Sequence, residues 1–266
     1  MTWTPAQWEG LYHSNTTLTL AELGLGAFTK ARVIVTEKPP LLQSLDREIE
    51  SFWEKFVQAH PSARNEPKLG IRGPEDLYLD DENLIVKSFL TSYAAVRFKN
   101  TRAAEDNQKL SDEKRDFLDN HFLTLGAGAY VTLSRDYLLG KRAEGVARAG
   151  LVEYVPQGLA DPRSEESLEN IFEDTVKKEL KEESGLEITD ILQSKATHVN
   201  IGPKYGDFTL IYRMIIDQKA RSKVRANPKE HTDIFWRSKE RILEMMQQDQ
   251  YALTPVTVAL FDKIIR

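Results

Sequence analysis

Three glutamates stand close together in the stretch KKELKEESGLEI, residues 177–188. Glu179, Glu182 and Glu183 occur at i, i+3 and i+4, the spacing that makes side chains neighbours on a helix. Neighbouring carboxylates repel one another, and removing them from water is costly unless a cation compensates their charge. A hard divalent ion such as Mg²⁺, or Mn²⁺ in its place, binds carboxylate oxygens. The spacing therefore indicates a metal site with these three glutamates as ligands.

A helix must hold these carboxylates. Residues 164–184 contain no proline or glycine, Ser164 and Ser167 are candidate N-caps, and Gly185 is a natural residue after the last turn. On a helical wheel at about 100° per residue, the glutamates continue the apolar side of the helix. That side carries Leu168, Ile171, Phe172, Thr175 and Val176. A solvated charge run would lie on the opposite side, so the wheel favours a metal site. The alternative is an acidic helix end exposed to solvent.

The surrounding segments predict an α/β fold. Apolar alternation predicts strands at residues 31–37, 84–93, 125–142, 150–158, 190–203, 207–217 and 232–238. Amphipathic spacing predicts helices at residues 44–60, 164–184 and 239–249. Residues 61–83 read as turn-rich, and the highly charged residues 100–116 read as a surface loop or exposed helix. We expect an α/β sandwich on a mixed sheet, with an N-terminal α/β extension at 1–115 and the main domain at 116–266.

Composition excludes several classes of function. The 266 residues include no cysteine, which excludes disulfides, thiolate catalysis and cysteine-bound zinc. The net charge of −5 gives no basic excess that would attract nucleic acid or an anionic membrane. Neither a secretory signal nor an apolar run of about 18 residues is evident. We expect a cytoplasmic protein, with the nucleus as an alternative, that acts on a small molecule; its oligomeric state stays open.

The segment KELKEESGL, residues 178–186, resembles the second half of the Nudix box, G-x5-E-x7-R-E-U-x-E-E-x-G-U, in which U is a bulky aliphatic residue. The resemblance implies a box helix beside a mixed sheet, with its carboxylates holding catalytic Mg²⁺. The first half departs from the pattern. Gly158 lies 20 positions before Lys178, six more than in the pattern. Asn170 and Lys178 stand where the family pairs a Glu with an Arg, so the brace of this loop is altered.

A further likeness covers about residues 45–262. The segments LTSYAAVRFKNT, GLVEYVPQG and KEHTDIFWRSKE, in this order, are similar to the UDP-glucose and UDP-galactose diphosphatase subgroup of Nudix hydrolases. That subgroup also carries an irregular box. The resemblance implies that water splits a UDP-hexose into UMP and hexose 1-phosphate.

Candidate catalytic groups follow from this chemistry. Glu182 or Glu183 could deprotonate the attacking water, and Glu230 precedes a predicted strand where many family members supply another acid. The alternative for Glu230 is an exposed loop acid. His231 could approach a phosphate, although a lone loop histidine is more often an ordinary surface group.

Candidate substrate-binding groups are spread more widely. Besides Gly158 and His231 they are Thr91, Ser92, Tyr93 and Arg97, with Lys99, Arg102, Lys204 and Tyr205 as weaker candidates. Strand-end packing and solvated loop charges are the alternatives for these residues.

Three other functions compete with UDP-sugar hydrolysis. The first is a Nudix pyrophosphatase acting on ADP-ribose, a dinucleotide or a coenzyme A derivative, since loops set such specificity. The second is a Nudix-fold binding module, which we would expect to lack one of the three glutamates. The third is an unrelated α/β protein whose match to the box is accidental.

Overall fold

The computed structural model describes residues 16–25, 28, 30–105, 110–146, 148–162, 166–202, 207–248 and 252–265. The predicted cap Ser164 and the weaker substrate candidates Lys204 and Tyr205 lie outside these residues. No helix in the described part is long and apolar enough to span a membrane.

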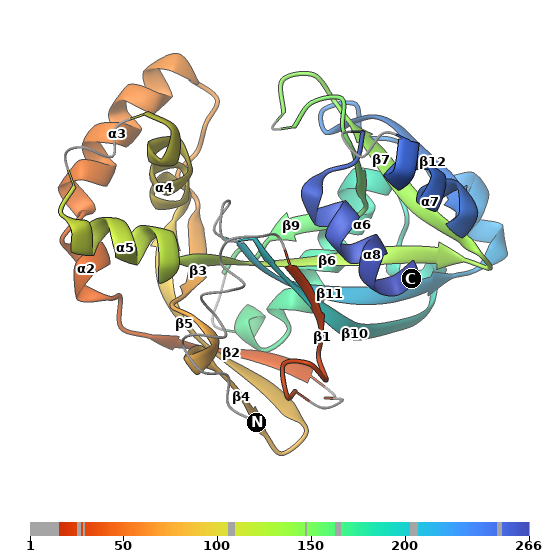
Figure 1. Cartoon of the computed structure of the whole chain (residues 1–266), viewed down its shortest axis with the longest axis horizontal. Coiled ribbons are helices and arrows are strands. Elements are labelled where there is room, and N and C mark those ends of the chain that lie inside the picture. The colour runs from red at the N-terminus through yellow and green to blue at the C-terminus, as the bar shows by residue number, and fades with distance from the viewer. Residues whose placement is uncertain are drawn as a thin grey trace.

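A mixed sheet organises the fold (Figure 1). Its central order is β1-β10-β11-β6-β3-β5-β2, with β4, β7, β8, β9 and β12 attached to it. The β6–β11 and β2–β5 pairs are parallel and the others are antiparallel. The strands are β1 Thr16–Thr19, β2 Lys30–Thr36, β3 Pro67–Ile71, β4 Leu77–Asp80, β5 Asn83–Ser92, β6 Leu123–Leu133, β7 Asp136–Arg142, β8 Val152–Tyr154, β9 Gln157–Leu159, β10 Ile191–Gly202, β11 Asp207–Ile216 and β12 His231–Ser238. The predicted α/β sandwich is confirmed.

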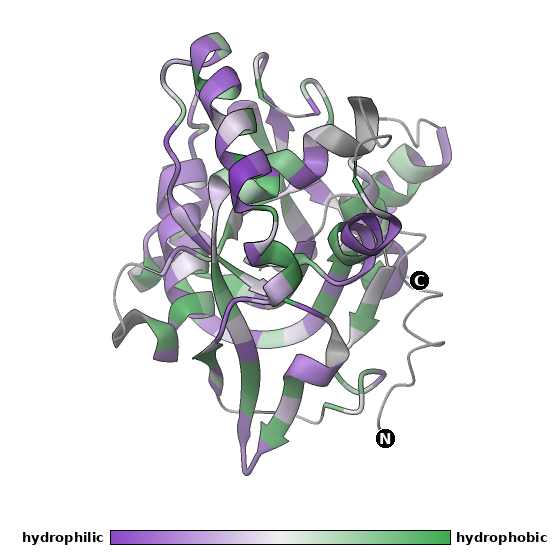
Figure 2. Ribbon diagram, turned by 90° about the vertical axis from the view of Figure 1, so that its left-hand side faces the viewer, coloured by the Kyte–Doolittle hydropathy of each residue, from purple (hydrophilic) through white to green (hydrophobic). Residues whose placement is uncertain are grey.

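Helices lie on both sides of this sheet. They are α2 Pro40–Gln43, α3 Asp46–Ala59, α4 Tyr93–Glu105, α5 Asp112–Asn120, α6 Ile171–Ser184, α7 Lys239–Gln248 and α8 Pro255–Ile265. Short 3-10 turns occur at η1 Pro74–Asp76, η2 Glu166–Glu169, η3 Ile188–Asp190 and η5 Gln218–Lys223. The predicted helices at 44–60 and 239–249 are confirmed as α3 and α7. Hydrophobic residues gather in the strands, while the helices carry many hydrophilic residues (Figure 2).

Two segments differ from their predictions. Residues 61–83 contain the strands β3 and β4 in addition to turns. Both strands pair with β5, and this pairing cannot be predicted from the local sequence pattern. Residues 100–116 hold the end of α4 and the start of α5, so the helix alternative was right. In α5, Phe117 and Leu118 are buried, because its apolar side packs in the extension.

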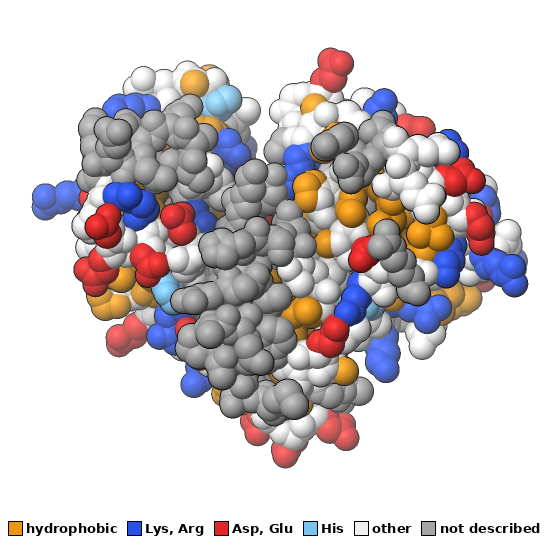
Figure 3. Space-filling model, viewed as in Figure 1, with side chains coloured by type: hydrophobic (Ala, Val, Ile, Leu, Met, Phe, Trp, Pro, Cys, Tyr) orange, Lys and Arg blue, Asp and Glu red, His pale blue; other side chains and the backbone are white. Residues whose placement is uncertain are grey.

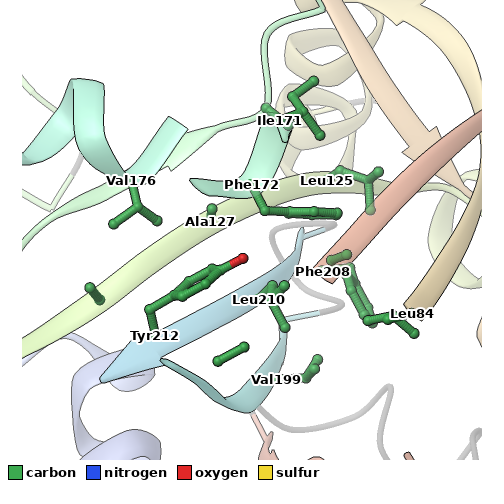
Figure 4. Close-up of a cluster of buried hydrophobic side chains, with 14 of the residues drawn as sticks. Leu84, Leu125, Ala127, Ile171, Phe172, Val176, Val199, Phe208, Leu210 and Tyr212 are labelled. Carbon is green, nitrogen blue, oxygen red and sulfur yellow. The ribbon is translucent and has the colours of Figure 1, made fainter. Parts of the chain in front are cut away.

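The main core lies between α6 and the sheet. Phe172 and Val176 of α6 lie over Leu125 and Ala127 of β6 and over Leu210 of β11 (Figure 4). All residues of β6 are buried, as expected for a central strand covered on both faces. The core therefore fixes α6, and with it the acidic segment, against the middle of the sheet.

A second core belongs to the extension. Helices α2 to α5 gather at one end of the molecule, and a notch separates them from the part that carries α6 and β7 (Figures 1 and 3). The sheet itself continues across this notch, because β3 pairs with both β5 and β6. The division into domains at residue 115 stays a prediction.

Candidate active site

Helix α6 begins later than predicted and ends where predicted. Residues 166–169 form the 3-10 turn η2, and Asn170 precedes α6 without a side-chain cap. Gly185 ends the helix in the left-handed conformation, with φ 71°, and its N–H donates to the Lys181 carbonyl at 3.0 Å. This conformation favours glycine because a Cβ would be strained there. The acidic cluster thus occupies the last turns of a well-defined helix.

The three glutamates face different surroundings. Glu183 is 2% exposed, the Glu179 side chain is 13% exposed, and the Glu182 side chain is 48% exposed. Glu179 and Glu183 are four residues apart and lie on the row of α6 that faces β9. Glu182 lies one step around the helix, beyond the cover of the sheet. The wheel placed all three on the packed side, and the structure buries Glu183 and leaves Glu179 half-buried.

Strand β9 meets the buried pair with a glycine and a backbone amide. A Cβ added to Gly158 would lie 2.5 Å from the Glu179 side chain, so only glycine fits beneath that carboxyl group. The Gln157 N–H donates to Glu183 Oε2 at 3.4 Å. Gly158 therefore allows the close approach of Glu179, and its predicted contact with a substrate stays a prediction.

Both buried carboxyl groups resist ionisation. Burial, together with the nearby Glu182 and Glu230, raises the pKa of Glu179 to about 7, although the positive charge of Lys178 lowers it in part. Burial, together with Glu153, Glu179 and Glu230, raises the pKa of Glu183 well above its ordinary value. A bound cation would relieve this accumulation of negative charge.

Lys178 already sits between two of the predicted ligands. Its Nζ lies 3.6 Å from Glu179 Oε1 and 3.7 Å from Glu182 Oε2. The family pattern pairs an Arg at this position with a Glu, but Asn170 replaces that Glu. Lys178 thus turns to the carboxylates of its own helix turn.

Glu230 is held close to the acidic end of α6. The loop before β12 is tied to the helix because Arg225 N–H donates to the Ser184 carbonyl at 3.0 Å and Asn227 N–H donates to the Glu183 carbonyl at 3.2 Å. Glu230 is half-buried, and its charge raises the pKa of both Glu179 and Glu183. The structure thus brings Glu230 near the box-like helix, as expected of a further acidic group.

His231 lies deeper than a loop histidine would. Its side chain is fully buried, and Nε2 lies 3.1 Å from Glu153 Oε1, which also pairs with Arg142. This ionic network joins β12 to β7 and β8 beneath the glutamates. The geometry assigns His231 a structural contact, and a contact with a phosphate stays a prediction. Glu153 was not predicted as a site residue, although a lone charged residue in an apolar strand such as LVEYV is a usable signal.

The predicted residues of the extension surround the junction of β5 and α4. Ser92 Oγ accepts the Ala95 N–H at 3.3 Å and begins the helix, while Tyr93 packs edge-on against Trp53. Arg97 lies over the ring of Phe56, 5.1 Å from its centroid. Thr91 Oγ1 and Arg97 Nε are buried without a hydrogen-bond partner. These packing contacts match the alternative proposed for this strand end, and substrate contacts stay predictions.

The donor set suits a hard divalent ion chemically, because it consists of carboxylate oxygens. Within the described residues, however, no three acidic or histidine side chains converge on one point. Glu179 and Glu182 would have to leave Lys178 to share an ion with Glu183.

Comparisons with known proteins find only distant structural neighbours. In sequence, the chain matches no family model and no curated protein. Its structural neighbours include a MutT protein, a Nudix hydrolase and a Nudix domain. A MutT protein from Methanosarcina mazei Go1 has a TM-score of 0.38 and 21% identity over 52% of this chain and 90% of its own. RenU, a Nudix hydrolase from M. smegmatis, has a TM-score of 0.37 and 17% identity over 52% and 81%.

A third neighbour is the Nudix domain of Shewanella oneidensis NrtR, solved with ADP ribose. It has a TM-score of 0.37 and 16% identity over 61% of this chain and 93% of its own. All three likenesses are distant, and they assign no function to this chain.

Proposed function

We propose that this chain is a Mg²⁺-dependent Nudix hydrolase that splits UDP-glucose or UDP-galactose into UMP and hexose 1-phosphate. The observation that carries the proposal is the buried pair Glu179 and Glu183, whose pKa values are raised and which face Gly158. Buried carboxyl groups with perturbed pKa values are characteristic of functional sites. They belong to the segment that resembles the specific half of the Nudix box.

Glu179, Glu182 and Glu183 would hold the ion through carboxylate oxygens. Bound Mg²⁺ neutralises the charge of a diphosphate and orients the attacking water. Glu182, Glu183 or Glu230 would take the proton of that water, since each lies in or beside the acidic end of α6. Lys178, once displaced from the carboxylates, would remain near the diphosphate as a point charge.

The substrate would lie between the acidic helix and the extension. Thr91, Ser92, Tyr93 and Arg97 occupy the β5–α4 junction on the extension side of the notch (Figures 1 and 3). The unpartnered Thr91 Oγ1 and Arg97 Nε support a polar contact there. Gly158 and His231 would line the opposite side.

The test is release of UMP from UDP-glucose, measured by chromatography with Mg²⁺ and with EDTA. We expect Mg²⁺-dependent release by the wild type and a loss of at least about 100-fold in Glu183→Gln, because such groups act directly on the reacting water. Glu173→Gln is the matched control, because Glu173 lies on the same helix but pairs outward with Lys177.

Two results would change the proposal. If UMP is absent but ADP-ribose, a dinucleotide or a coenzyme A derivative is hydrolysed, the reaction class stands and the substrate is wrong. If no nucleotide is hydrolysed although Mg²⁺ and nucleotide bind, the chain is a binding module.

A further inference from the structure

A polar pair lies across two parallel strands on the sheet face opposite α6. Thr124 of β6 and Asp207 of β11 are register partners, so their side chains project from the same face. The alternate residues Leu125 and Phe208 point to the core under α6 (Figure 4). Asp207 is half-buried whereas its partner Thr124 is fully buried, so this face is exposed only beside Asp207.

A buried ammonium group borders the pair. Lys99 of α4 is 6% exposed, its Nζ donates to the Phe122 carbonyl, and it lies 5.6 Å from the centroid of the Phe122 ring. Its charge acts on Asp207, as does that of Arg148. The extension thus brings a cation to the edge of the main domain at the position of Asp207.

Two hydroxyl groups, one in the pair and one on a nearby tyrosine, are buried without a partner. Thr124 Oγ1 and Tyr154 Oη have no hydrogen-bond partner, and both residues are 0% exposed. The Tyr154 ring packs over Gly128, and its hydroxyl is close enough to Asp207 and Glu183 for both charges to affect it. Buried polar groups are nearly always satisfied in native proteins, and an unsatisfied one is costly. These hydroxyls therefore indicate a ligand that supplies their partners.

The chemistry of the set selects the ligand. It offers a carboxylate that accepts, an ammonium that donates, and two hydroxyls that do both. A fully ionised phosphate does not suit it, because it has no hydrogen to donate to Asp207, and an apolar group would leave every partner unsatisfied. Adjacent hydroxyl groups of a sugar ring both donate and accept, and they match this mixture.

We propose that Asp207, Thr124 and Lys99 form a subsite for the ring hydroxyls of a sugar. The inference rests on the proposed function and names the part of the substrate that this face recognises. The charges of Asp207 and Glu183 both act on Tyr154, so the two carboxyl groups lie within electrostatic reach of one ring. Both sugar rings of a UDP-hexose, hexose and ribose, carry adjacent hydroxyls, and the experiment distinguishes them.

The experiment measures binding of UMP and glucose 1-phosphate by calorimetry, with Mg²⁺ present, to the wild type, Asp207→Asn and Thr124→Val. We expect Asp207→Asn to weaken one of the two ligands at least about 10-fold, since a hydrogen bond to a charged group is lost. Loss confined to glucose 1-phosphate identifies the hexose ring, and loss confined to UMP identifies ribose.

Thr124→Val separates a binding role from a structural one. The free protein should melt at the same or a higher temperature, because the lost hydroxyl had no partner, while the same ligand binds about 3- to 10-fold more weakly. Thr132→Val is the control: Thr132 lies on the same strand and its hydroxyl donates to the Met214 carbonyl at 3.2 Å. It should melt lower and bind both ligands as the wild type does.

Three outcomes separate the two proposals. If both variants bind both ligands like the wild type, or if the wild type binds neither, the subsite does not exist. If the wild type hydrolyses UDP-glucose with a KM that neither variant changes, the subsite fails and the proposed function stands. If Asp207→Asn loses one ligand but the wild type does not hydrolyse UDP-glucose, the subsite stands and the proposed reaction fails.

Discussion

The two halves of helix α6 use the same residue types in opposite ways. In the first half, Lys177 lies 3.3 Å from Glu173 Oε2 and 3.7 Å from Asp174 Oδ1, and these side chains are partly exposed. In the second half, Glu179 and Glu183 turn toward β9, where Glu183 is buried and only 13% of the Glu179 side chain is exposed. Position against the sheet, and not composition, separates a solvated charge network from a candidate active site.

The difference has an energetic meaning. Exposed ion pairs on a helix contribute only about 0.2–0.5 kcal/mol each. Burying two carboxyl groups side by side destabilises the protein, as the raised pKa values of Glu179 and Glu183 show. Folded proteins retain such unfavourable arrangements mainly at functional sites. The second half of α6 is therefore the candidate for function.

After Glu183→Gln, the largest effect on activity is expected from filling the space beneath Glu179. Gly158→Ala would place a methyl group 2.5 Å from that side chain and displace the carboxyl group. Because displacements near 1 Å cost up to about 100-fold in rate, we expect kcat/KM for UDP-glucose to fall about 10- to 100-fold.

Gly73→Ala is the control for that variant. A methyl group there would meet Glu75 Oε2 at 2.6 Å, but Glu75 is exposed and can turn away. Equal activity of Gly158→Ala and wild type would show that the position of Glu179 does not matter for the reaction.

Removing a buried charge should stabilise the metal-free protein. We expect Glu183→Gln to raise the free energy of unfolding by about 1–2 kcal/mol, because the repulsion by its neighbours disappears. Glu173→Gln should lower it by no more than about 0.5 kcal/mol, because an exposed pair is lost. Urea denaturation in EDTA measures both, and destabilisation by Glu183→Gln would contradict the contrast between the two halves.

Stability should also depend on pH through Glu179. Its pKa is about 7 in the folded chain and 4.5 ordinarily, so the folded state retains a proton that the unfolded state has lost. The free energy of unfolding of the metal-free protein should therefore fall, by on the order of 1 kcal/mol, as pH rises from 4.5 to 7.

The matching variant is Glu179→Gln, which should remove this part of the pH dependence. Mg²⁺ affinity of the wild type should rise over the same pH range, since an ion binds the ionised carboxylate. Urea titrations at pH 5, 6, 7 and 8 measure the free energy of unfolding, and calorimetry at the same pH values measures Mg²⁺ affinity. If the free energy of unfolding rises through this range in both Glu179→Gln and the wild type, the Glu179 carboxyl group is not the cause.

The smallest effect concerns Lys178. A cation between Glu179 and Glu182 competes with a metal ion for the same oxygens. Lys178→Gln should therefore bind Mg²⁺ about 3-fold more tightly, and Lys177→Gln should not, because Coulomb interactions at partly exposed sites are weak. Weaker Mg²⁺ binding in Lys178→Gln would mean that Lys178 supports the metal site instead of competing with it.

Much of the fold was predictable from short-range pattern. Apolar periodicity predicted the strands β6, β11 and β12 and the helices α3 and α7. It did so because the apolar side of each element packs in a core. Strands β3 and β4 were missed, since their stability depends on pairing with β5. Helix α8 was not predicted either.

The candidate site was predictable in part. Glu179 and Glu183 were found through helical spacing, whereas Glu153 and Asp207 lie on other strands and join the region only through strand pairing. Glu182 was expected beside them, but its side chain is 48% exposed. A helical wheel gives the direction of each side chain, and it does not show how far the sheet covers the helix.

The sequence alone determined the helix, its end at Gly185 and the side on which its carboxylates lie, because residues within a few turns set all three. Only the tertiary structure decided that Gly158 lies under Glu179 and that Lys99 meets the Phe122 carbonyl. The first contact depends on the pairing of β6 with β9, and the second joins α4 to the residue before β6. Burial and electrostatic coupling depend on such long-range neighbours, which a local pattern does not contain.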